Sequence, residues 1–414
     1  MPDTQPDLLV AGGGAAGLVT ALAACQAGWS VTLVDPGPLT AKRTNVKSDA
    51  RTTAIMASGI RMLEQLGVWQ ELEPISAPLR YLQLIDDSTG NTLDQRFDAA
   101  EIDQEWFAQN VPNEALKSTL MAVLKKQNGI TLLPGTTVHG ISHRDQHLQV
   151  RIGPDEGPQD TIEPKLLVAA DGRRSACRDM LRIGVVKGAA TEMALVFNTE
   201  HAVSHDGISY EFHGPLADGF GQVTTIPLPG NRSAINLVGD EASMNWIGAM
   251  EEPALRTLVE DATRGRLGKI MQAGKPSGFP VRPFRAQRLS ASRAVLVGEA
   301  AHALAPIGAQ GLNTTLADIA VLIDLLGPSG RADPGRPDVT DGYRRARRFD
   351  VIGRSGAISL LSDMVHRRNP VVDQLRRLGL RGIGAVGPLR RQLMSQGMKP
   401  LGQLPRLMRP ISQP

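Results

Sequence analysis

The sequence contains only two cysteines, Cys25 and Cys177, among its 414 residues. Two cysteines form no disulfide framework, so a reducing compartment is expected. The sequence also lacks a run of about 18 apolar residues, the length that a membrane-spanning helix needs. No basic segment followed by an apolar core and a small-residue cleavage site opens the sequence, so no secretion signal is expected. We therefore expect a cytoplasmic protein that meets membranes only at their surface.

Net charge is small as well. The formal net charge is +3, which is too low to predict binding to nucleic acid. Its distribution is uneven, because residues 351–414 carry eleven Lys and Arg residues against two acidic ones, Asp363 and Asp373. Such a basic segment fits a membrane surface, a protein partner or a solvated face. The length and the hydrophobic content of 42% predict an ordinary globular protein of two or three intertwined subdomains.

No metal site is predicted from residue spacing. His139, His143 and His147 recur every four residues, but they fall across an expected strand and the loop beside it. A metal site needs its ligands to converge on one point, so these histidines are assigned to the surface.

Apolar periodicity predicts the order of the elements. The chain begins with a strand at 7–11, a helix at 15–27 and a strand at 31–35, which form a βαβ unit. Further helices are expected at 49–67, 116–127, 254–272 and 312–326, and further strands at 130–133, 148–152, 166–170 and 294–297. Four strands separated by turn residues predict an inserted antiparallel sheet, at 194–198, 208–212, 222–227 and 234–238. Residues 327–337 are typical of a linker, and a helical tail follows.

A glycine-rich loop lies between the first strand and the first helix. It reads G-x-G-x-x-G, with glycines at Gly12, Gly14 and Gly17. These glycines permit a tight turn, the approach of a pyrophosphate and close packing of helix on strand, while the helix N-terminus faces the phosphates. Asp35, at the end of the second strand, is placed to accept hydrogen bonds from ribose hydroxyls. This unit predicts a dinucleotide site without separating FAD from NAD.

Two more glycine-containing segments follow expected strands. One reads A-D-G-R-R-S from Ala170 to Ser175. The other reads V-G-E-A-A-H from Val297 to His302 and continues to Gly311-Leu312-Asn313, where a helix is expected. Asp-Gly alone is an ordinary turn pair, but a second helix N-terminus after a glycine-rich loop suits the far end of an extended ligand.

With these motifs in this order, the sequence resembles the class A flavoprotein aromatic hydroxylases, which have the p-hydroxybenzoate-hydroxylase fold. The resemblance implies an α/β fold: a Rossmann-type FAD-binding domain with an inserted, mostly antiparallel β-sheet substrate domain and a helical C-terminal tail. It implies that the first loop holds the ADP half of FAD and that Asp171 and Gly172 lie near both flavin and nicotinamide. Gly298 and Glu299 would hold the flavin ribitol, with Glu299 departing from the Asp that is usual there.

A narrower resemblance covers most of the chain. The run D-A-R-T-T-A at 49–54 and L-G-V-W at 66–69 are similar to the signature of the ubiquinone-biosynthesis hydroxylases, as is the run from Tyr343 to Asp350. The matching arginine in that pattern contacts FAD phosphate, which implies this role for Arg51; the alternative is a surface arginine at a helix end. Those enzymes hydroxylate the ring of a polyprenylated phenol, so the resemblance implies such a substrate.

The resemblance also implies the residues that carry the reaction. Val138 resembles the family position whose backbone meets the adenine, although a plain strand residue explains it equally well. The Pro306 loop would face the ring where oxygen is transferred, and the helix N-terminus at Gly311 would stabilise negative charge on reduced flavin. The expected cofactor-binding residues are Gly12, Gly14, Ala15, Ala16, Gly17, Asp35, Arg51, Val138, Asp171, Gly298, Glu299, Gly311, Leu312 and Asn313.

The implied reaction uses NAD(P)H and O₂. NAD(P)H would reduce FAD, and a flavin hydroperoxide would transfer one oxygen to the ring. No second G-x-G-x-x-G appears between an expected strand and an expected helix, which fits transient nicotinamide binding and leaves another electron donor open. The basic C-terminal region would bind the inner-membrane surface or other ubiquinone-biosynthesis proteins.

The domain boundaries follow from the motifs. We expect residues 1–75, 111–182 and 281–340 to form the FAD-binding domain, and residues 76–110 and 183–280 to form the substrate domain, with a basic helical region at 341–414. Two alternatives stay open: a hydroxylase of a small soluble aromatic acid, and a non-catalytic flavoprotein subunit of a biosynthetic assembly. A halogenase is disfavoured, because the W-x-W-x-I-P pattern of that branch is absent.

Overall fold

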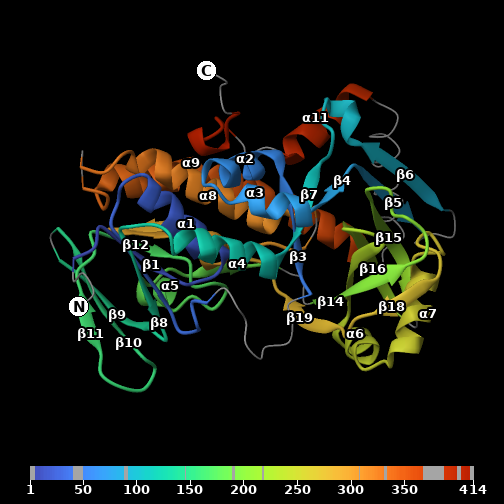
Figure 1. The fold of residues 1–414 in the computed structure, drawn as a ribbon, viewed down its shortest axis with the longest axis horizontal. Helices are drawn as coiled ribbons and strands as arrows, with labels where there is room; N and C mark the ends of the chain where they lie inside the picture. Colours follow the sequence, from blue (N-terminus) through green and yellow to red (C-terminus); the bar gives the residue numbers. More distant parts are fainter. Residues whose placement is uncertain are drawn as a thin grey trace.

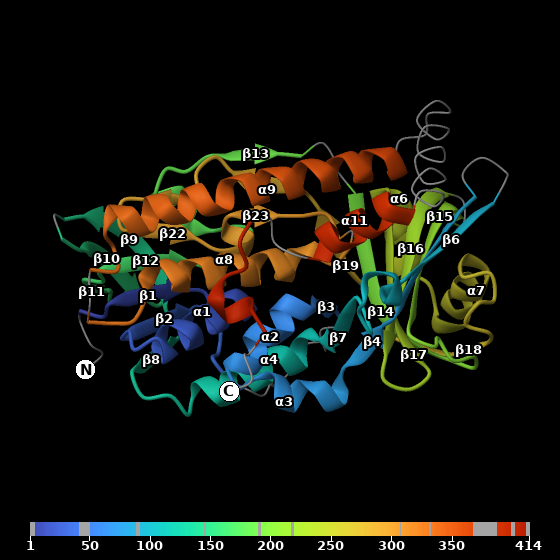
Figure 2. The same ribbon diagram turned by 90° about the horizontal axis from the view of Figure 1, so that it is seen from above.

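The computed structural model describes residues 5–40, 50–87, 92–144, 146–188, 192–216, 219–306, 308–330, 333–366, 387–398 and 402–410. A six-stranded sheet lies at one end of the molecule and an eight-stranded sheet at the other, and two long helices run between them (Figures 1 and 2). Asp49 and most of the basic residues expected in the tail lie outside the described residues.

The six-stranded sheet is a Rossmann-type sheet with the strand order β21-β22-β12-β1-β2-β8. Its strands are β1 (Leu8–Ala11), β2 (Val31–Asp35), β8 (Ile130–Pro134), β12 (Leu166–Ala169), β21 (Ser290–Ala291) and β22 (Ala294–Leu296). All of them pair in parallel except the edge strand β21. Leu8, Leu166 and Val295 are fully buried, as expected for a parallel sheet covered on both faces. The five strands predicted for this sheet from apolar runs are confirmed.

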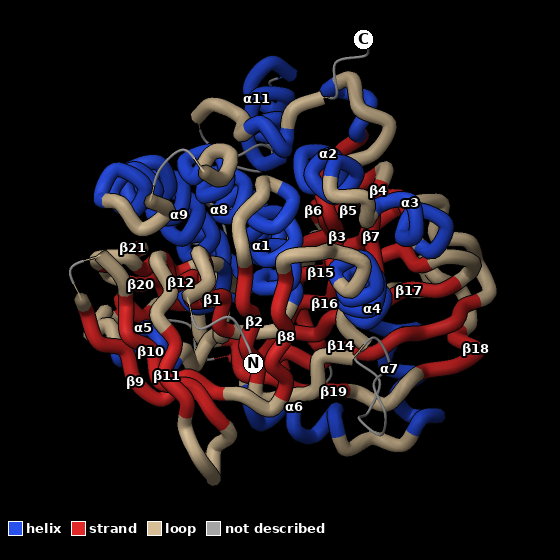
Figure 3. Tube along the Cα trace, turned by 60° about the vertical axis from the view of Figure 1, so that its left-hand side comes forward, coloured by secondary structure: helices blue, strands red, loops and turns tan. Residues whose placement is uncertain are grey.

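Helices cover one face of this sheet and a small antiparallel sheet covers the other (Figure 3). The helical layer contains α1 (Ala15–Gln26), α4 (Asn113–Leu124) and α8 (Gln310–Leu326), and α1 contacts both of the others. The small sheet contains β9 (Thr137–His143), β10 (Leu148–Gly153) and β11 (Asp160–Ile162). This α/β arrangement confirms the predicted fold class.

The eight-stranded sheet is almost entirely antiparallel and has the order β18-β14-β17-β16-β15-β5-β6, with β19 beside β14. Its strands are β5 (Tyr81–Asp86), β6 (Leu93–Asp98), β14 (Glu192–His201), β15 (Ile208–Leu216), β16 (Gly219–Leu228), β17 (Arg232–Gly239), β18 (Ile270–Ala273) and β19 (Ser277–Val281). Helices α6 (Glu241–Gly248) and α7 (Glu252–Ala262) pack on one face through a separate apolar core. The four predicted strands are confirmed, while β5 and β6 join the sheet from an earlier part of the chain.

Two expected helices are too long. The expected helix at 49–67 begins instead with β3 (Thr52–Met56), and only α2 (Ala57–Gln65) is helical. β3 pairs with β7 (Ala108–Pro112), so a partner distant in sequence overrides the local spacing. The expected helix at 254–272 ends at Ala262, because Arg264 (φ 52°) and Gly265 (φ 66°) reverse the chain into β18.

The remaining elements are short. They are α3 (Trp69–Leu72), η1 (Glu73–Ile75), β4 (Ala77–Leu79), η2 (Ala99–Ile102), α5 (Ala176–Met180), β13 (Val185–Lys187), β20 (Phe284–Ala286), η3 (Gly298–Ala300) and β23 (His302–Ala303). Two three-stranded sheets have the orders β3-β7-β4 and β13-β20-β23.

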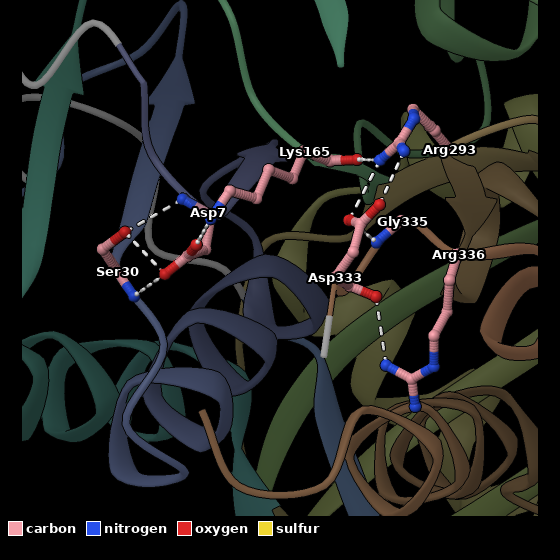
Figure 4. Close-up of polar contacts among 7 residues, drawn as sticks. All are labelled: Asp7, Ser30, Lys165, Arg293, Asp333, Gly335 and Arg336. Atoms are coloured by element: carbon pink, nitrogen blue, oxygen red, sulfur yellow. Dashed lines mark hydrogen bonds and ion pairs between the residues drawn. The ribbon is translucent and has the colours of Figure 1, made fainter. Parts of the chain in front are cut away.

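The chain after α8 folds back over the six-stranded sheet. The expected linker leads into α9 (Pro337–His366), and Asp333 fixes it by accepting from Arg293 Nη2 at 2.6 Å and from Gly335 N–H at 2.9 Å (Figure 4). Helix α9 packs along α8. After α11 (Gly387–Met398), η4 (Arg406–Met408) returns to contact α2 and α8. Within the described ranges, no helix is long and apolar enough to cross a membrane.

Candidate active site

The first glycine loop packs tightly against the protein on one side and is open on the other. Gly12 has φ 110°, and a Cβ there would lie 2.3 Å from the carbonyl oxygen of Ala170. A Cβ at Gly17 would lie 1.8 Å from the carbonyl oxygen of Gly12. A Cβ at Gly14 would meet nothing within 4 Å. The loop therefore demands glycine for packing at two positions and leaves free space beside the third.

The open side of the loop is also the N-terminus of α1. This end has no side-chain cap and no acidic residue in its first turn, so the N–H groups of Ala15 and Ala16 are available to an anion. Asp35 lies beside them: its Oδ2 accepts from Gly13 N–H at 2.5 Å and its Oδ1 from Gly37 N–H at 2.7 Å. The arrangement suits a pyrophosphate with a sugar next to it.

The second motif lies directly against the first. Gly12 faces Ala170 and Asp171, although about 160 residues separate them in sequence. The Asp171 carboxylate accepts from Ser175 Oγ at 2.5 Å and from Cys177 N–H at 3.0 Å, so it fixes the turn into α5. Burial and this neighbouring carboxylate raise the pKa of the Cys177 thiol, which therefore stays protonated near neutral pH.

Sequence reasoning missed Arg178, which joins the second motif to the third. Its guanidinium is buried and donates to the carbonyl oxygens of Ala300 at 3.1 Å and Arg173 at 3.2 Å. Arg173 in turn lies 3.7 Å from the carboxylate of Glu299. The sequence offered no signal for this role, because Arg178 lies in a run with other charged residues, D-G-R-R-S-A-C-R-D.

The third motif contacts the first helix. Gly298 has φ 60°, and a Cβ there would lie 3.3 Å from the Cβ of Ala16 and 3.0 Å from the side chain of Thr315 in α8. Its N–H donates to Asp318 Oδ2 at 3.2 Å. The structure thus brings all three motifs together at the carboxyl ends of the parallel strands, where α/β folds bind ligands.

A buried charge network supports the third motif from behind. Asp318 lies 2.7 Å from His302 Nε2 through Oδ2 and 2.7 Å from Arg347 Nε through Oδ1. Burial alone would raise the pKa of Asp318, but the charges of His302 and Arg347 outweigh it and lower the pKa. The His302 ring is therefore fixed against a buried carboxylate.

The same network reaches the start of α8. Arg347 Nη1 lies 2.7 Å from Asp350, and Asp350 lies 2.8 Å from Arg354 Nε. Arg354 then bonds to the side chain of Gln310, whose amide donates to Gly308 O at 3.1 Å. These ion pairs were not foreseen, and the network links the C-terminal helix α9 to the loop before α8.

The start of α8 is fixed by Asn313. Its side-chain amide donates to the carbonyl oxygens of Ala54 and Ala309, both at 2.8 Å, and its Oδ1 accepts from Met56 N–H at 2.9 Å. A Cβ at Gly311 would meet nothing within 4 Å, and α8 has no side-chain cap. The side chain of Asn313 therefore ties β3 to α8, while the helix N-terminus at Gly311 is open.

A cavity of about 350 Å³ lies beside this helix N-terminus. One wall comes from the eight-stranded sheet and the other from β3, β7 and the loop before α8. Expected residues that line it are Arg51, Glu299, Pro306, Gly311 and Leu312. Apolar side chains that line it include Leu79, Phe107, Val196, Ile226, Phe279 and Leu304.

Two polar atoms of the cavity lining have no partner. Thr52 Oγ1 and Asn236 Oδ1 are buried and accept or donate no hydrogen bond within the described chain. Buried polar atoms are normally satisfied, so these two are suited to a polar group of a bound molecule. Val138 lies outside the cavity lining, buried in β9 opposite Ile152.

No metal centre is found among the residues that the structure describes, since no three His, Cys, Asp or Glu side chains are grouped to hold an ion. His139 Nε2 lies 3.0 Å from the carbonyl oxygen of Pro154, and His147 lies 3.6 Å from Glu163.

Comparisons with known proteins agree with this geometry. The family described as FAD binding domain matches residues 5–351. The chain is 30% identical to ubiquinone hydroxylase UbiL of Rhodospirillum rubrum over 419 residues, covering 99% of this chain and 94% of that protein. It is 26% identical to 3-demethoxyubiquinol 3-hydroxylase of Escherichia coli, covering 96% of this chain and 100% of that protein.

Solved structures share the fold. The structure superimposes on p-nitrophenol 4-monooxygenase of Pseudomonas putida with a TM-score of 0.76 at 17% identity, covering 97% of this chain and 100% of that chain. The likeness at this identity concerns the fold. The resemblance expected from the sequence is confirmed.

Proposed function

Since this chain belongs to the FAD binding domain family and is an FAD-dependent aromatic-ring monooxygenase, we propose that it hydroxylates the ring of a polyprenylated phenol in ubiquinone biosynthesis. The observation that carries this proposal is the mostly apolar cavity at the N-terminus of α8, next to three contacting glycine motifs. Ubiquinone hydroxylases among the relatives favour the phenolic substrate.

The residues fit FAD in an extended pose. Gly14, Ala15 and Ala16 would hold the pyrophosphate at the open N-terminus of α1, with Asp35 on the ribose. Gly298 and Glu299 would hold the ribitol, and Arg51 a phosphate oxygen. Val138 would meet the adenine through its backbone, and Asp171 would lie near the flavin at the turn that it fixes. When bound, FAD would supply the redox chemistry, with NAD(P)H as the hydride donor and O₂ as the source of the oxygen atom added to the ring and of the one released as water.

The chain itself orients and shields the reacting groups. The open N-terminus of α8 at Gly311 and Leu312 would place its positive end beside the flavin ring, where negative charge develops on reduction. Pro306 would face the substrate ring from the opposite side, and the side chain of Asn313 holds the start of α8 against β3. Apolar walls exclude water, which keeps the oxygen transfer from being lost to solvent.

The cavity also supplies polar contacts for a phenol. The hydroxyl of the substrate would donate to Asn236 Oδ1, which is buried and without a partner in the described chain. The apolar lining would take the ring and the first part of the prenyl chain. Membrane-surface contact and contact with other biosynthetic proteins belong to the same proposal, because a polyprenylated phenol resides in the bilayer.

The test is turnover by the purified protein. The visible spectrum records flavin, and NAD(P)H oxidation under air is followed with and without a short-tailed prenylphenol, with product mass measured. Prenylphenol-dependent oxidation that gives a product one oxygen heavier supports the proposal. Coupled turnover on a small aromatic acid with no response to prenylphenols would replace it with the soluble-substrate alternative.

A further inference from the structure

A second hollow lies away from the cavity and has a different character. It is a groove of about 730 Å³ between α9 and residues 285–293, larger than the cavity beside the glycine motifs. None of the three motifs lines it. The groove therefore needs an explanation that the flavin site does not supply.

Arginines dominate the groove. Arg285, Arg288, Arg344 and Arg348 line it, and Asp341 is the one carboxylate among its lining residues. Asp341 already pairs with Arg344 at 3.2 Å. Within the described chain, the guanidinium groups of Arg285 and Arg348 have no ion pair or hydrogen bond. Several like charges around one hollow repel one another, which favours an anionic ligand.

Three described arginines of residues 351–414 form ion pairs within the protein. Arg354 pairs with Asp350, Arg390 with Glu101 and Arg406 with Asp324. Their charges are neutralised by the protein itself.

Exposed apolar side chains lie on α9, which borders the groove, and on β13, which pairs with the strand of Arg285. Phe349 is 75% exposed and Ile352 38% exposed, and both lie on α9 at helical spacing from Arg345 and Arg348. Val186 of β13 is 41% exposed and lies opposite Arg285 across the strand pair. Figure 2 shows α9 and β13 along the same side of the molecule. Large apolar side chains gathered at the surface mark an interaction site.

We propose that this surface, formed by the outer face of α9, β13 and the arginine groove, docks the protein on an anionic phospholipid bilayer. Arg285, Arg288 and Arg348 bind lipid phosphates, while Phe349 and Ile352 enter the headgroup region. A soluble phosphate would use the arginines but would leave the exposed apolar side chains without a role. This inference rests on the proposed function, because it names the membrane that carries the polyprenylated substrate.

The first experiment is co-flotation of the full-length protein with vesicles of phosphatidylcholine, with and without phosphatidylglycerol. Binding is expected for the anionic vesicles and should fall as salt shortens the Debye length from about 10 Å to about 3 Å. Each arginine removed should lower the partition coefficient about fivefold, so Arg288→Gln with Arg348→Gln lowers it about 25-fold. Phe349→Ser should weaken the binding that remains at high salt.

The matched control is the double variant Arg232→Gln with Arg256→Gln, which removes the same charge from β17 and α7. It should bind vesicles within a few-fold of the unsubstituted protein. Loss of binding equal to that of the groove variant would reduce the effect to net charge and overturn the assignment. Absence of binding to anionic vesicles, or binding of inorganic pyrophosphate in the groove without any vesicle binding, would also overturn it.

Turnover on a short-tailed prenylphenol in solution separates this inference from the proposed function. The groove variant should keep that turnover, because none of its substitutions lines the cavity. A protein that floats with vesicles but does not turn over the phenol refutes the function alone. A protein that turns over the phenol but ignores vesicles refutes the docking surface alone.

Discussion

The carboxylate of Asp318 in α8 lies 2.7 Å from the guanidinium Nε of Arg347 in α9, and both side chains are 1% exposed. The same carboxylate accepts from the N–H of Gly298 in the third glycine motif. One buried ion pair thus joins the C-terminal helix to the loop proposed to hold the ribitol. The packing of α9 is thereby coupled to the geometry of that loop.

Replacement of Arg347 by Met should destabilise the protein strongly. It leaves Asp318 and Asp350 with less compensation in the interior, which costs about 3–5 kcal/mol for a buried pair. Urea denaturation measures the free energy of unfolding. Arg344→Met on the same helix is the control, because its pair with Asp341 is exposed and should matter by less than about 1 kcal/mol. Equal losses for the two variants would refute a special role of the buried pair.

The free energy of unfolding should decrease as the pH is lowered, and Asp318 should contribute to this decrease. Its pKa is lowered in the folded protein, so its contribution is present above the ordinary aspartate pKa of about 3.9 and is lost as the pH falls towards the folded value. Urea denaturation of the unsubstituted protein and of Asp318→Asn should therefore give a difference that shrinks below about pH 4. A difference that is constant from neutral to acidic pH would contradict a lowered pKa for this carboxyl.

Alanine substitutions at two glycines of the first loop should have different effects on stability and on FAD binding. Gly12→Ala meets the carbonyl oxygen of Ala170 and an unfavourable φ, so it should lower the melting temperature as well as flavin binding. Gly14→Ala meets no protein atom within 4 Å, so it should keep the melting temperature yet weaken FAD binding about tenfold or more. Flavin fluorescence titration and thermal unfolding measure both. Gly356→Ala is the control, because a Cβ there also meets no atom within 4 Å. Unchanged FAD affinity of Gly14→Ala would show that this loop does not bind the pyrophosphate.

The polar atom of Asn236 should contribute to substrate binding and not to stability. Asn236→Leu removes a buried carbonyl oxygen without a partner, so the free energy of unfolding should stay constant or rise. Loss of one hydrogen bond of about 0.5–1.5 kcal/mol should raise KM for the phenol about 2- to 12-fold. Asn198→Leu removes an equally unpartnered oxygen from β14 outside the cavity lining and should leave KM unchanged. If both variants have the same KM, Asn236 does not contact the substrate.

Local patterns were enough for much of the fold. The βαβ unit and the strands at 166–170 and 294–297 are continuous apolar runs beside glycines, so their identity depends little on the rest of the chain. The helix predicted for residues 52–56 was wrong, because their strand geometry depends on pairing with β7, about 50 residues away. β5 was missed for a related reason, since it joins the large sheet parallel to β15 from a distant part of the chain.

The candidate site shows the same division. The three glycine motifs could be read from sequence, because turns and helix starts constrain residue type locally. The charge network could not, because Asp318 and Arg347 are brought together only by the packing of α8 on α9. The local signal was Asp318, a charged residue within the mostly apolar run of 312–326. Its position did not identify its partner.

The contact of Gly12 with Ala170, and of Gly298 with Ala16, also has a consequence for the order in which the protein is made. At about 5–20 residues per second, a ribosome needs on the order of a minute or less to travel from the first loop to Arg347. For part of that time the first glycine loop exists without the residues that it contacts, and Asp318, once made, lacks its counter-ion until Arg347 follows. An FAD site built from all three motifs would therefore be complete only after the C-terminal helix has left the ribosome.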